Sequence, residues 1–289
     1  MTSSAEPVDD ARADVARDDD ALLDVRGLTV EYAVGRQRPP LRAVDGVDLR
    51  IGARETVGLV GESGSGKSTI GRAILGLVPV AAGTVRFDGA DITRASQRQR
   101  RSLSSELQVI FQDPYSSLNP TRSIGDTLAE TLRAQRGRSD VAARVRTMLE
   151  RVGLPADAAR RYPAHFSGGQ RQRIAIARAL MASPRLVICD EAVSALDLSV
   201  QAQVLNLLRE LQHELGLSYL FISHDLAVVR HVSHRIVVLY RGQVVEQGRA
   251  ADVYANPQHA YTQALLEAAP APDPDVQRAR REARLRRAG

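Results

Sequence analysis

Cysteine and long apolar runs are almost absent from this chain, and each shortage excludes a class of structure. Cys189 is the only cysteine, so neither a disulfide nor a cluster held by several cysteines can form within the chain. The longest apolar runs, such as RIVVLY, have the length of a strand, and none approaches the roughly 18–20 residues that cross a bilayer. The N-terminus has no apolar segment typical of a signal peptide. We therefore expect an intracellular chain that reaches a membrane only through a partner.

The positive charge is concentrated at one end of the chain. The formal charge is +5 and the pI is about 9.8, which raises the question of nucleic-acid binding. Much of the excess lies in QRARREARLRRAG, and we separate residues 276–289 as a basic tail. Such runs are usually solvated, with contact to anionic lipid headgroups or nucleic acid as the alternative. Residues 1–20 are acidic and lack aromatic side chains, which predicts a disordered segment.

The single lysine, Lys67, lies among glycines in GESGSGKST at residues 61–69. Its ammonium is a compact point charge that fits a narrow ring of backbone N–H groups, whereas guanidinium is a broad fork. The pattern G-x-x-x-x-G-K-S is that of the phosphate loop, in which backbone amides surround phosphates and the serine hydroxyl binds magnesium. A predicted strand precedes it and a predicted helix follows, so the helix N-terminus faces the phosphates. A glycine-rich turn with a stray lysine is the much weaker alternative. The predicted nucleotide-binding residues in this loop are Gly61, Ser63, Gly64, Gly66, Lys67, Ser68 and Thr69.

Short apolar runs alternate with amphipathic helical segments along most of the chain. RLVICD, SYLFIS and RIVVLY have the composition of buried strands, and VQAQVLNLLRELQHEL between the first two has helical periodicity. Residues 123–162 have helical periodicity as well. Alternation of this kind around a phosphate loop predicts a parallel α/β core. A helical insertion is then expected at about residues 113–172.

Two adjacent carboxylates, Asp190 and Glu191, end the predicted strand LVICDE. The carboxyl ends of strands are where α/β sheets bind ligands. We expect Asp190 to position magnesium together with Ser68, and Glu191 to polarise the attacking water. Cys189, in the same strand, is expected to be a small buried side chain.

The segment HFSGGQRQRIAIARALM resembles the signature sequence of ATP-binding cassette (ABC) proteins, with Phe166 where leucine is commoner. Ser167 is placed to cap a helix, and two glycines let its backbone approach an anion. The helix is expected to bury Ile174, Ala177, Leu180 and Met181 and to present Arg171 and Arg173 to solvent or a partner. The resemblance implies that the signature contacts ATP held by an opposing subunit. The residues concerned are Ser167, Gly168, Gly169 and Gln170.

The remaining positions of the family follow in order. Gln112 in FQDPYSSLNP matches the glutamine loop, which in the family touches magnesium or the attacking water and faces the transmembrane partner. Asp197 in SALD matches the loop that crosses the dimer, and His224 in ISHDL matches the histidine that contacts the γ-phosphate. Tyr32 lies where the family stacks an aromatic ring on adenine. Ala192 departs from the usual proline after the two acids, which removes no catalytic group.

The resemblance implies the P-loop NTPase fold of the ABC nucleotide-binding domain over residues 21–252: a RecA-like parallel-sheet core with an antiparallel β subdomain and a helical insertion. FQDPYSSLNP and YANPQHAYTQALLEAAPAPDP are similar to the oligopeptide/dipeptide and nickel importer branch. Residues 253–275 would be the C-terminal extension of that branch, with a plain surface helix as the alternative. Some members hold an iron–sulfur cluster there through several cysteines. This extension has none, so we predict no cluster.

Function follows from this resemblance. It implies an ATPase that uses ATP and Mg²⁺ to drive import of peptides or related solutes from the cytoplasmic face of a membrane. The implied partners are a second, non-identical ABC ATPase, two transmembrane permease subunits and, indirectly, a solute-binding protein. A nucleic-acid or ribosome ATPase is the competing class, but such proteins usually carry two cassettes, a coiled coil or a zinc insertion, so no nucleic acid is expected. A catalytically dead scaffold conflicts with the presence of Lys67, Glu191 and His224. The cargo stays open among peptides, nickel and glutathione-like solutes.

Overall fold

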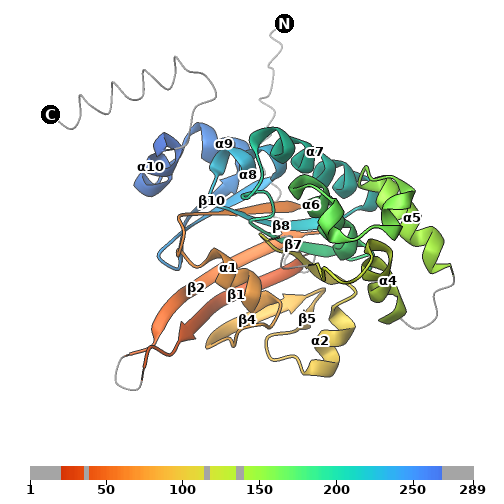
Figure 1. Cartoon of the computed structure of the whole chain (residues 1–289). Coiled ribbons are helices and arrows are strands. Elements are labelled where there is room, and N and C mark those ends of the chain that lie inside the picture. Colours follow the sequence, from red (N-terminus) through yellow and green to blue (C-terminus); the bar gives the residue numbers. More distant parts are fainter. Residues whose placement is uncertain (1–20, 36–38, 114–117, 135–139, 269–289) are drawn as a thin grey trace, which may run out of the picture.

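The computed structural model describes residues 21–35, 39–113, 118–134 and 140–268. These residues form two β-sheets with helices packed between and around them (Figure 1). The acidic N-terminus and the basic tail, which the sequence sets apart at residues 1–20 and 276–289, lie outside the described residues. The same is true of the last residues of the predicted extension.

The larger sheet has six strands in the order β10-β9-β3-β8-β7-β6. Every neighbouring pair is parallel except β9 and β10, which are antiparallel. All five residues of β3 and all six of β8 are buried, as expected for central strands covered on both faces. The predicted parallel α/β core is therefore confirmed. The strands are β3 (Thr56–Val60), β6 (Leu107–Ile110), β7 (Leu186–Asp190), β8 (Ser218–Ser223), β9 (Arg235–Tyr240) and β10 (Gln243–Arg249).

The smaller sheet is antiparallel, in the order β2-β1-β4-β5. Helix α1 (Lys67–Ile74) lies between the two sheets, because its apolar side chains share one buried cluster with strands of both (Figure 1). Alternate residues of β7 and β8 face this cluster, and the intervening ones face the opposite layer. The phosphate loop is thus held between the two sheets. The strands are β1 (Ala21–Tyr32), β2 (Leu41–Gly52), β4 (Ala82–Phe87) and β5 (Ala90–Asp91).

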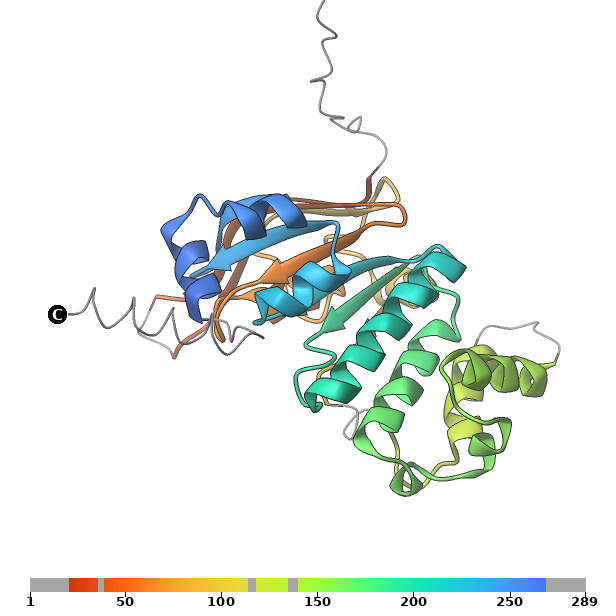
Figure 2. The same ribbon diagram turned by 90° about the horizontal axis from the view of Figure 1, so that it is seen from above.

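The opposite face of the large sheet is covered by helices, which pack into the second buried cluster. Figure 2 shows α4 and α5 at one end of the molecule and the C-terminal helices at the other. Within the described ranges, no helix is both long and apolar enough to cross a membrane. The helices of this layer and its flanks are α4 (Ile124–Ala134), α5 (Val141–Arg151), α6 (Gly168–Leu180), α7 (Leu198–Leu215), α8 (Leu226–Val232), α9 (Ala250–Ala255) and α10 (Ala260–Ala268), with α2 (Gln97–Leu103) beside the small sheet and two 3-10 turns, η1 (Ala156–Arg160) and η2 (Pro163–His165).

Helix α6 packs largely as its sequence predicts. Its four predicted core residues, Ile174, Ala177, Leu180 and Met181, are all buried. Arg173 differs from the prediction: it is half-buried, and its Nη1 donates a hydrogen bond to the carbonyl oxygen of Val152 at 2.9 Å. The carbonyl lies at the C-terminal end of α5, where helical carbonyls lack partners within the helix. Arg173 therefore joins the helical insertion to α6.

Candidate nucleotide site

The phosphate loop between β3 and α1 depends on glycine at two positions. Gly61 has φ 154°, and a Cβ there would lie 2.2 Å from the carbonyl oxygen of Leu239. Gly66 has φ 107°, and a Cβ there would lie 2.4 Å from the carbonyl oxygen of Ala43. Any side chain at these positions would be strained and would clash with backbone. The loop is therefore fixed against β9 on one side and β2 on the other.

The turn between β9 and β10 ties the loop to the antiparallel sheet. The Gly242 N–H donates to the Ser65 carbonyl, and the Asp45 N–H donates to the Gly242 carbonyl, both at 2.9 Å. Gly242 is therefore a bridge between the phosphate loop and β2. Sequence reasoning missed this bridge, because a turn glycine after a strand predicts a hairpin but not what the hairpin touches.

Lys67 is the first residue of α1 and is only 3% exposed. Its Nζ donates hydrogen bonds to the carbonyl oxygens of Gly61 and Glu62, both at 2.7 Å. Burial lowers the pKa of Lys67, while the charges of Glu191, Asp190 and Glu62 partly oppose this shift. Because Gly66 precedes the helix and has no side chain, no side chain of the N-cap occupies the N–H groups of the first turn. The lysine ammonium and these N–H groups suit an anionic ligand.

Ser68 and Asp190 come together from α1 and the end of β7. The Ser68 hydroxyl donates to Asp190 Oδ1 at 2.7 Å. A hydroxyl and a carboxylate are hard oxygen ligands of the kind Mg²⁺ prefers. Among the residues with described positions, no cluster of three or more His, Cys, Asp or Glu side chains has the form of a metal site. This pair suits Mg²⁺ nevertheless, because that ion usually takes one or two carboxylates together with water and substrate phosphates.

Glu191 follows Asp190 and has a left-handed backbone with φ 50°, which is uncommon for a residue with a side chain. Its N–H donates to the Ile222 carbonyl at 3.0 Å, and its carbonyl accepts from the N–H and hydroxyl of Ser194. These bonds hold the backbone in its strained form. The carboxylate Oε2 lies 3.8 Å from Nδ1 of His224, which follows β8. The glutamate side chain is 18% exposed and the histidine 56%.

Cys189 is fully buried in β7, between Ile110 of β6 and Phe221 of β8. Burial raises the pKa of the Cys189 thiol, and the neighbouring Asp190 charge raises it further. A buried thiol held in its protonated form is a poor nucleophile and a poor metal ligand. Its predicted structural role agrees with this environment.

The signature residues begin α6. Ser167 Oγ accepts from the Gln170 N–H at 3.3 Å, and Gln170 Oε1 accepts from the Ser167 N–H at 3.0 Å, so the predicted helix cap is present. A Cβ on Gly169 would lie 2.4 Å from Cγ1 of Val200 in α7. Gly169 thus has a packing reason in addition to the anion contact expected from the sequence. Ser167 and Gln170 are exposed, and Gly168 is half-buried.

The other predicted residues lie on separate elements. Tyr32 is the last residue of β1 and pairs with Leu41 of β2. Two residues further along β2, the carbonyl of Ala43 lies against Gly66 of the phosphate loop. Gln112 is exposed, two residues after the end of β6. Asp197 caps α7, and the hydrogen bond from the Val200 N–H, with that from Ser199, lowers its pKa. The described hydrogen bonds of Asp197 stay within its own loop and helix start, so the chain alone does not bring it to the phosphate loop.

A contact from the C-terminal extension to the phosphate loop was also missed. The Glu62 N–H donates to the hydroxyl of Tyr261, in α10, at 2.8 Å. The Tyr261 ring lies against that of Tyr240, with centroids 4.3 Å apart and planes at 39°. The sequence predicts a helix at YTQALL but contains no signal that its tyrosine meets residue 62.

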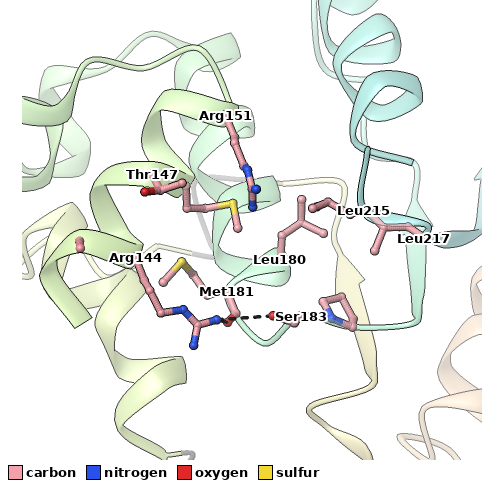
Figure 3. Close-up of a pocket in the computed structure, with 11 residues that line it drawn as sticks. Arg144, Thr147, Arg151, Leu180, Met181, Ser183, Leu215 and Leu217 are labelled. Carbon is pink, nitrogen blue, oxygen red and sulfur yellow. Dashed lines mark hydrogen bonds between the residues drawn. The ribbon is translucent and has the colours of Figure 1, made fainter. Parts of the chain in front are cut away.

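A cavity of about 300 Å³ lies elsewhere, between α5 and the connections that lead into β7 and β8 (Figure 3). Pro184 and Leu217 line it and precede the strands whose far ends are followed by Glu191 and His224. It is therefore at the end of the sheet opposite the nucleotide site. Arg151 of α5, which lines the cavity, forms a salt bridge with Glu214 of α7 at 3.0 Å. The cavity therefore lies where the helical insertion contacts the core.

Comparisons with known proteins agree with this geometry. The ABC transporter family matches residues 44–194, and the C-terminal region of oligopeptide/dipeptide transporters matches residues 245–288. The chain is 52% identical over 267 residues to the oligopeptide transport ATP-binding protein OppF of Salmonella typhimurium, covering 89% of this chain and 80% of that protein. It is also 52% identical to a putative peptide import ATP-binding protein of Brucella ovis, over 88% of this chain and 80% of that one.

Two solved structures share the fold. One is the ATP-binding cassette MJ0796, a dimer in a post-hydrolysis state bound to ADP and Pi, with a TM-score of 0.71 and 27% identity over 79% of this chain and 98% of that one. The other is CbiO1 of Clostridium perfringens, part of the transporter complex CbiONQ, with a TM-score of 0.72 and 27% identity over 82% and 92%. With the family matching more than half of its length, the chain belongs to the ABC transporter family, as one of its ATP-binding subunits.

Proposed function

We propose that this chain is the ATP-hydrolysing subunit that energises an importer of peptides or related small solutes. The observation that carries the ATPase assignment is the meeting of two distant segments: Ser68 of α1 donates to Asp190 of β7, beside the buried ammonium of Lys67. The importer assignment is supported by the match of residues 245–288 to the C-terminal region of oligopeptide/dipeptide transporters and by the peptide-import names of the relatives.

ATP would bind with its phosphates in the loop that Gly61, Gly64 and Gly66 shape. The Lys67 ammonium donates to two backbone carbonyls, which hold it in the loop, and its third N–H would donate to a phosphate oxygen, a bond strengthened by charge–charge attraction. The N–H groups and side chains of the loop and of the first turn of α1, including Ser63, Ser68 and Thr69, complete the cradle. Tyr32 would pack on the adenine ring.

Magnesium would be held by Ser68 and Asp190, with Gln112 as a further oxygen ligand, and would supply neutralisation of the phosphate charge. The hydrogen bond from Ser68 to Asp190 fixes the orientation of the serine hydroxyl beside the carboxylate. Glu191 is the proposed general base, because its fixed backbone places its carboxylate at the carboxyl edge of the sheet. His224, 3.8 Å from that carboxylate, would contact the γ-phosphate.

A second ABC ATPase would complete the site. The cap of α6 would contact the phosphate of nucleotide held by the opposing subunit, through Ser167, Gly168, Gly169 and Gln170. Asp197, exposed at the start of α7, would act across the same interface. Two transmembrane permease subunits would contact the chain near Gln112 at the cytoplasmic face of the membrane. The closing and reopening of the two ATPase subunits would be transmitted to them there. A solute-binding protein would deliver the cargo to them.

The Glu191→Gln variant tests the catalytic assignment. Glutamine keeps the size of the side chain but cannot accept the proton of the attacking water, so we expect ATP turnover to fall at least about 100-fold. ATP affinity should stay close to that of the wild type, because the proposed phosphate ligands are unchanged. Phosphate release and equilibrium binding of ATP, measured on the assembled transporter, provide the two readouts.

The matched control is Glu210→Gln, the same chemical change on the exposed face of α7. It should leave both turnover and affinity unchanged. Turnover near the wild-type rate in Glu191→Gln would show that another group activates water, and the proposed role of Glu191 would be abandoned.

A further inference from the structure

We propose that Tyr261 is a positioning residue for the ATPase reaction, through which the C-terminal extension fixes one peptide group of the phosphate loop. The inference rests on the proposed function, since it concerns how this loop binds ATP. Tyr261 bonds to the backbone of Glu62, which is not among the proposed nucleotide-binding residues. It acts through the peptide group that joins Gly61 to Glu62.

That peptide group is held from both sides. Its carbonyl, which belongs to Gly61, accepts from Lys67 Nζ at 2.7 Å. Its N–H, which belongs to Glu62, donates to the Tyr261 hydroxyl at 2.8 Å. In a trans peptide the carbonyl and N–H point in opposite directions, so the two side chains lie on opposite sides of one planar unit. Rotation of this peptide would break both hydrogen bonds together.

The peptide is one that needs such support. Glycine permits rotations that other residues resist, and Gly61 precedes the amide at φ 154°. A rotated peptide would withdraw the carbonyl that now places the Lys67 ammonium in the loop. The lysine would then lose part of its alignment toward the phosphates. If the peptide and the Lys67 ammonium are already oriented before ATP binds, less conformational entropy is lost on binding.

Tyr261 is itself firmly placed. The Glu246 carboxylate of β10 accepts from the N–H groups of Gln258 at 2.8 Å and His259 at 3.0 Å, which anchors the segment that leads into α10. His259 Nδ1 then accepts from the Tyr261 N–H at 3.1 Å. The Tyr261 ring packs on Tyr240, which ends β9 just before the turn that binds Ser65. The extension therefore braces the same loop that the β9–β10 turn holds.

Tyr261→Phe removes the hydroxyl and keeps the ring. Water can replace the lost acceptor at the exposed Glu62, so the effect should be moderate: the KM and Kd for ATP should rise about 3- to 10-fold. The kcat at saturating ATP should stay within about twofold, because the proposed catalytic groups are unaffected. The melting temperature of the free chain should change little, since the packing on Tyr240 remains. Kd is measured on the full-length chain and KM and kcat on the assembled transporter.

Tyr254→Phe is the matched control. Tyr254 lies in α9 of the same extension, with its ring under the Arg230 guanidinium at 4.1 Å, and has no described bond to the phosphate loop. Its ATP affinity should equal that of the wild type. Tyr261→Ala should show the same loss of affinity together with a lower melting temperature, because it also removes the ring.

An unchanged ATP affinity in Tyr261→Phe would overturn the proposal, and so would an equal loss in Tyr254→Phe. A loss of kcat without a change in KM would overturn it as well, since positioning of the binding loop predicts the reverse. If the wild-type chain itself neither binds nor hydrolyses ATP, the proposed function fails and this inference fails with it. The two failures are distinguished by the wild-type measurement.

Discussion

Lys67 illustrates how one residue combines a strong local signal with a tertiary environment. The spacing around it predicts a phosphate loop, but the sequence does not reveal that its ammonium is almost fully buried on two carbonyl oxygens. Burial penalises the charged form, so the pKa of Lys67 is lowered despite three nearby carboxylates. A bound polyphosphate would raise it again by placing negative charge beside the ammonium.

ATP affinity should therefore fall at alkaline pH. Binding takes up a proton wherever free Lys67 is partly deprotonated and bound Lys67 is not, and affinity decreases with pH in that window. The lowered pKa places the start of the window below the ~10.4 of an ordinary lysine. Equilibrium binding of ATP measured from about pH 7 to 10 checks this expectation.

Lys67→Arg separates this cause from general alkaline effects. Arginine stays charged over the whole range, although its broad fork fits the loop poorly and overall affinity should drop. The residual affinity of this variant should not decline with pH as that of the wild type does. Parallel pH profiles for the two proteins would rule out Lys67 as the titrating group.

At the scale of elements, the contact between α6 and α7 explains a glycine that the sequence assigns to ligand binding alone. A methyl group on Gly169 would overlap Cγ1 of Val200. Valine in a helix is nearly confined to one rotamer, so it cannot turn aside easily. The close approach of the two helices therefore requires glycine here, whatever the signature binds.

Gly169→Ala should lower the free energy of unfolding of the isolated chain. Overpacking of about 1–3 kcal/mol outweighs the gain of about 1 kcal/mol in helix propensity. In the background of Val200→Ala, which removes the clashing methyl group, the same substitution should be neutral or stabilising. Urea unfolding of the four proteins gives the coupling, and additivity of the two changes would contradict the predicted clash.

The whole molecule places the nucleotide site where two sheets and the C-terminal extension meet. The phosphate loop contacts β2, β9, the β9–β10 turn and α10. These elements are far apart in the sequence, from residue 41 to residue 268. None of the hydrogen bonds described for the exposed Ser167 and Gln170 of the α6 cap, or for the exposed Asp197, reaches the phosphate loop. We expect these residues to contact nucleotide only if a second subunit is present, as proposed above.

An affinity pull-down from detergent-solubilised membranes tests the assembly. We expect two polytopic membrane proteins and a second, non-identical ABC ATPase to accompany the chain, identified by mass spectrometry. An unrelated tagged protein, processed in the same way, serves as the control. Ribosomes or DNA from the soluble fraction, without a membrane partner, would overturn the transport assignment and leave the ATPase chemistry standing.

The local parts of this protein were accessible from its sequence. Strands such as TVGLV and LVICD are apolar throughout, and the phosphate loop is recognisable because glycine spacing reflects backbone conformation, which is a property of a few neighbouring residues. The cap formed by Ser167 and Gln170 is local in the same sense. The partial burial of Arg173 was not predicted, since helical periodicity does not reveal that the end of another helix offers it a carbonyl.

Contacts between distant segments were decided by the tertiary structure alone. The bond from Glu62 to Tyr261 spans 199 residues, and that from Ser68 to Asp190 spans 122. The second pair was predictable because both residues belong to recurring motifs at the carboxyl edge of a parallel sheet. The first has no motif: it exists because β9 and β10 carry the extension back to the loop. The sequence thus predicted the chemistry of the candidate nucleotide site. The fold determined which segments support that site, because such contacts depend on which surfaces the folded chain brings together.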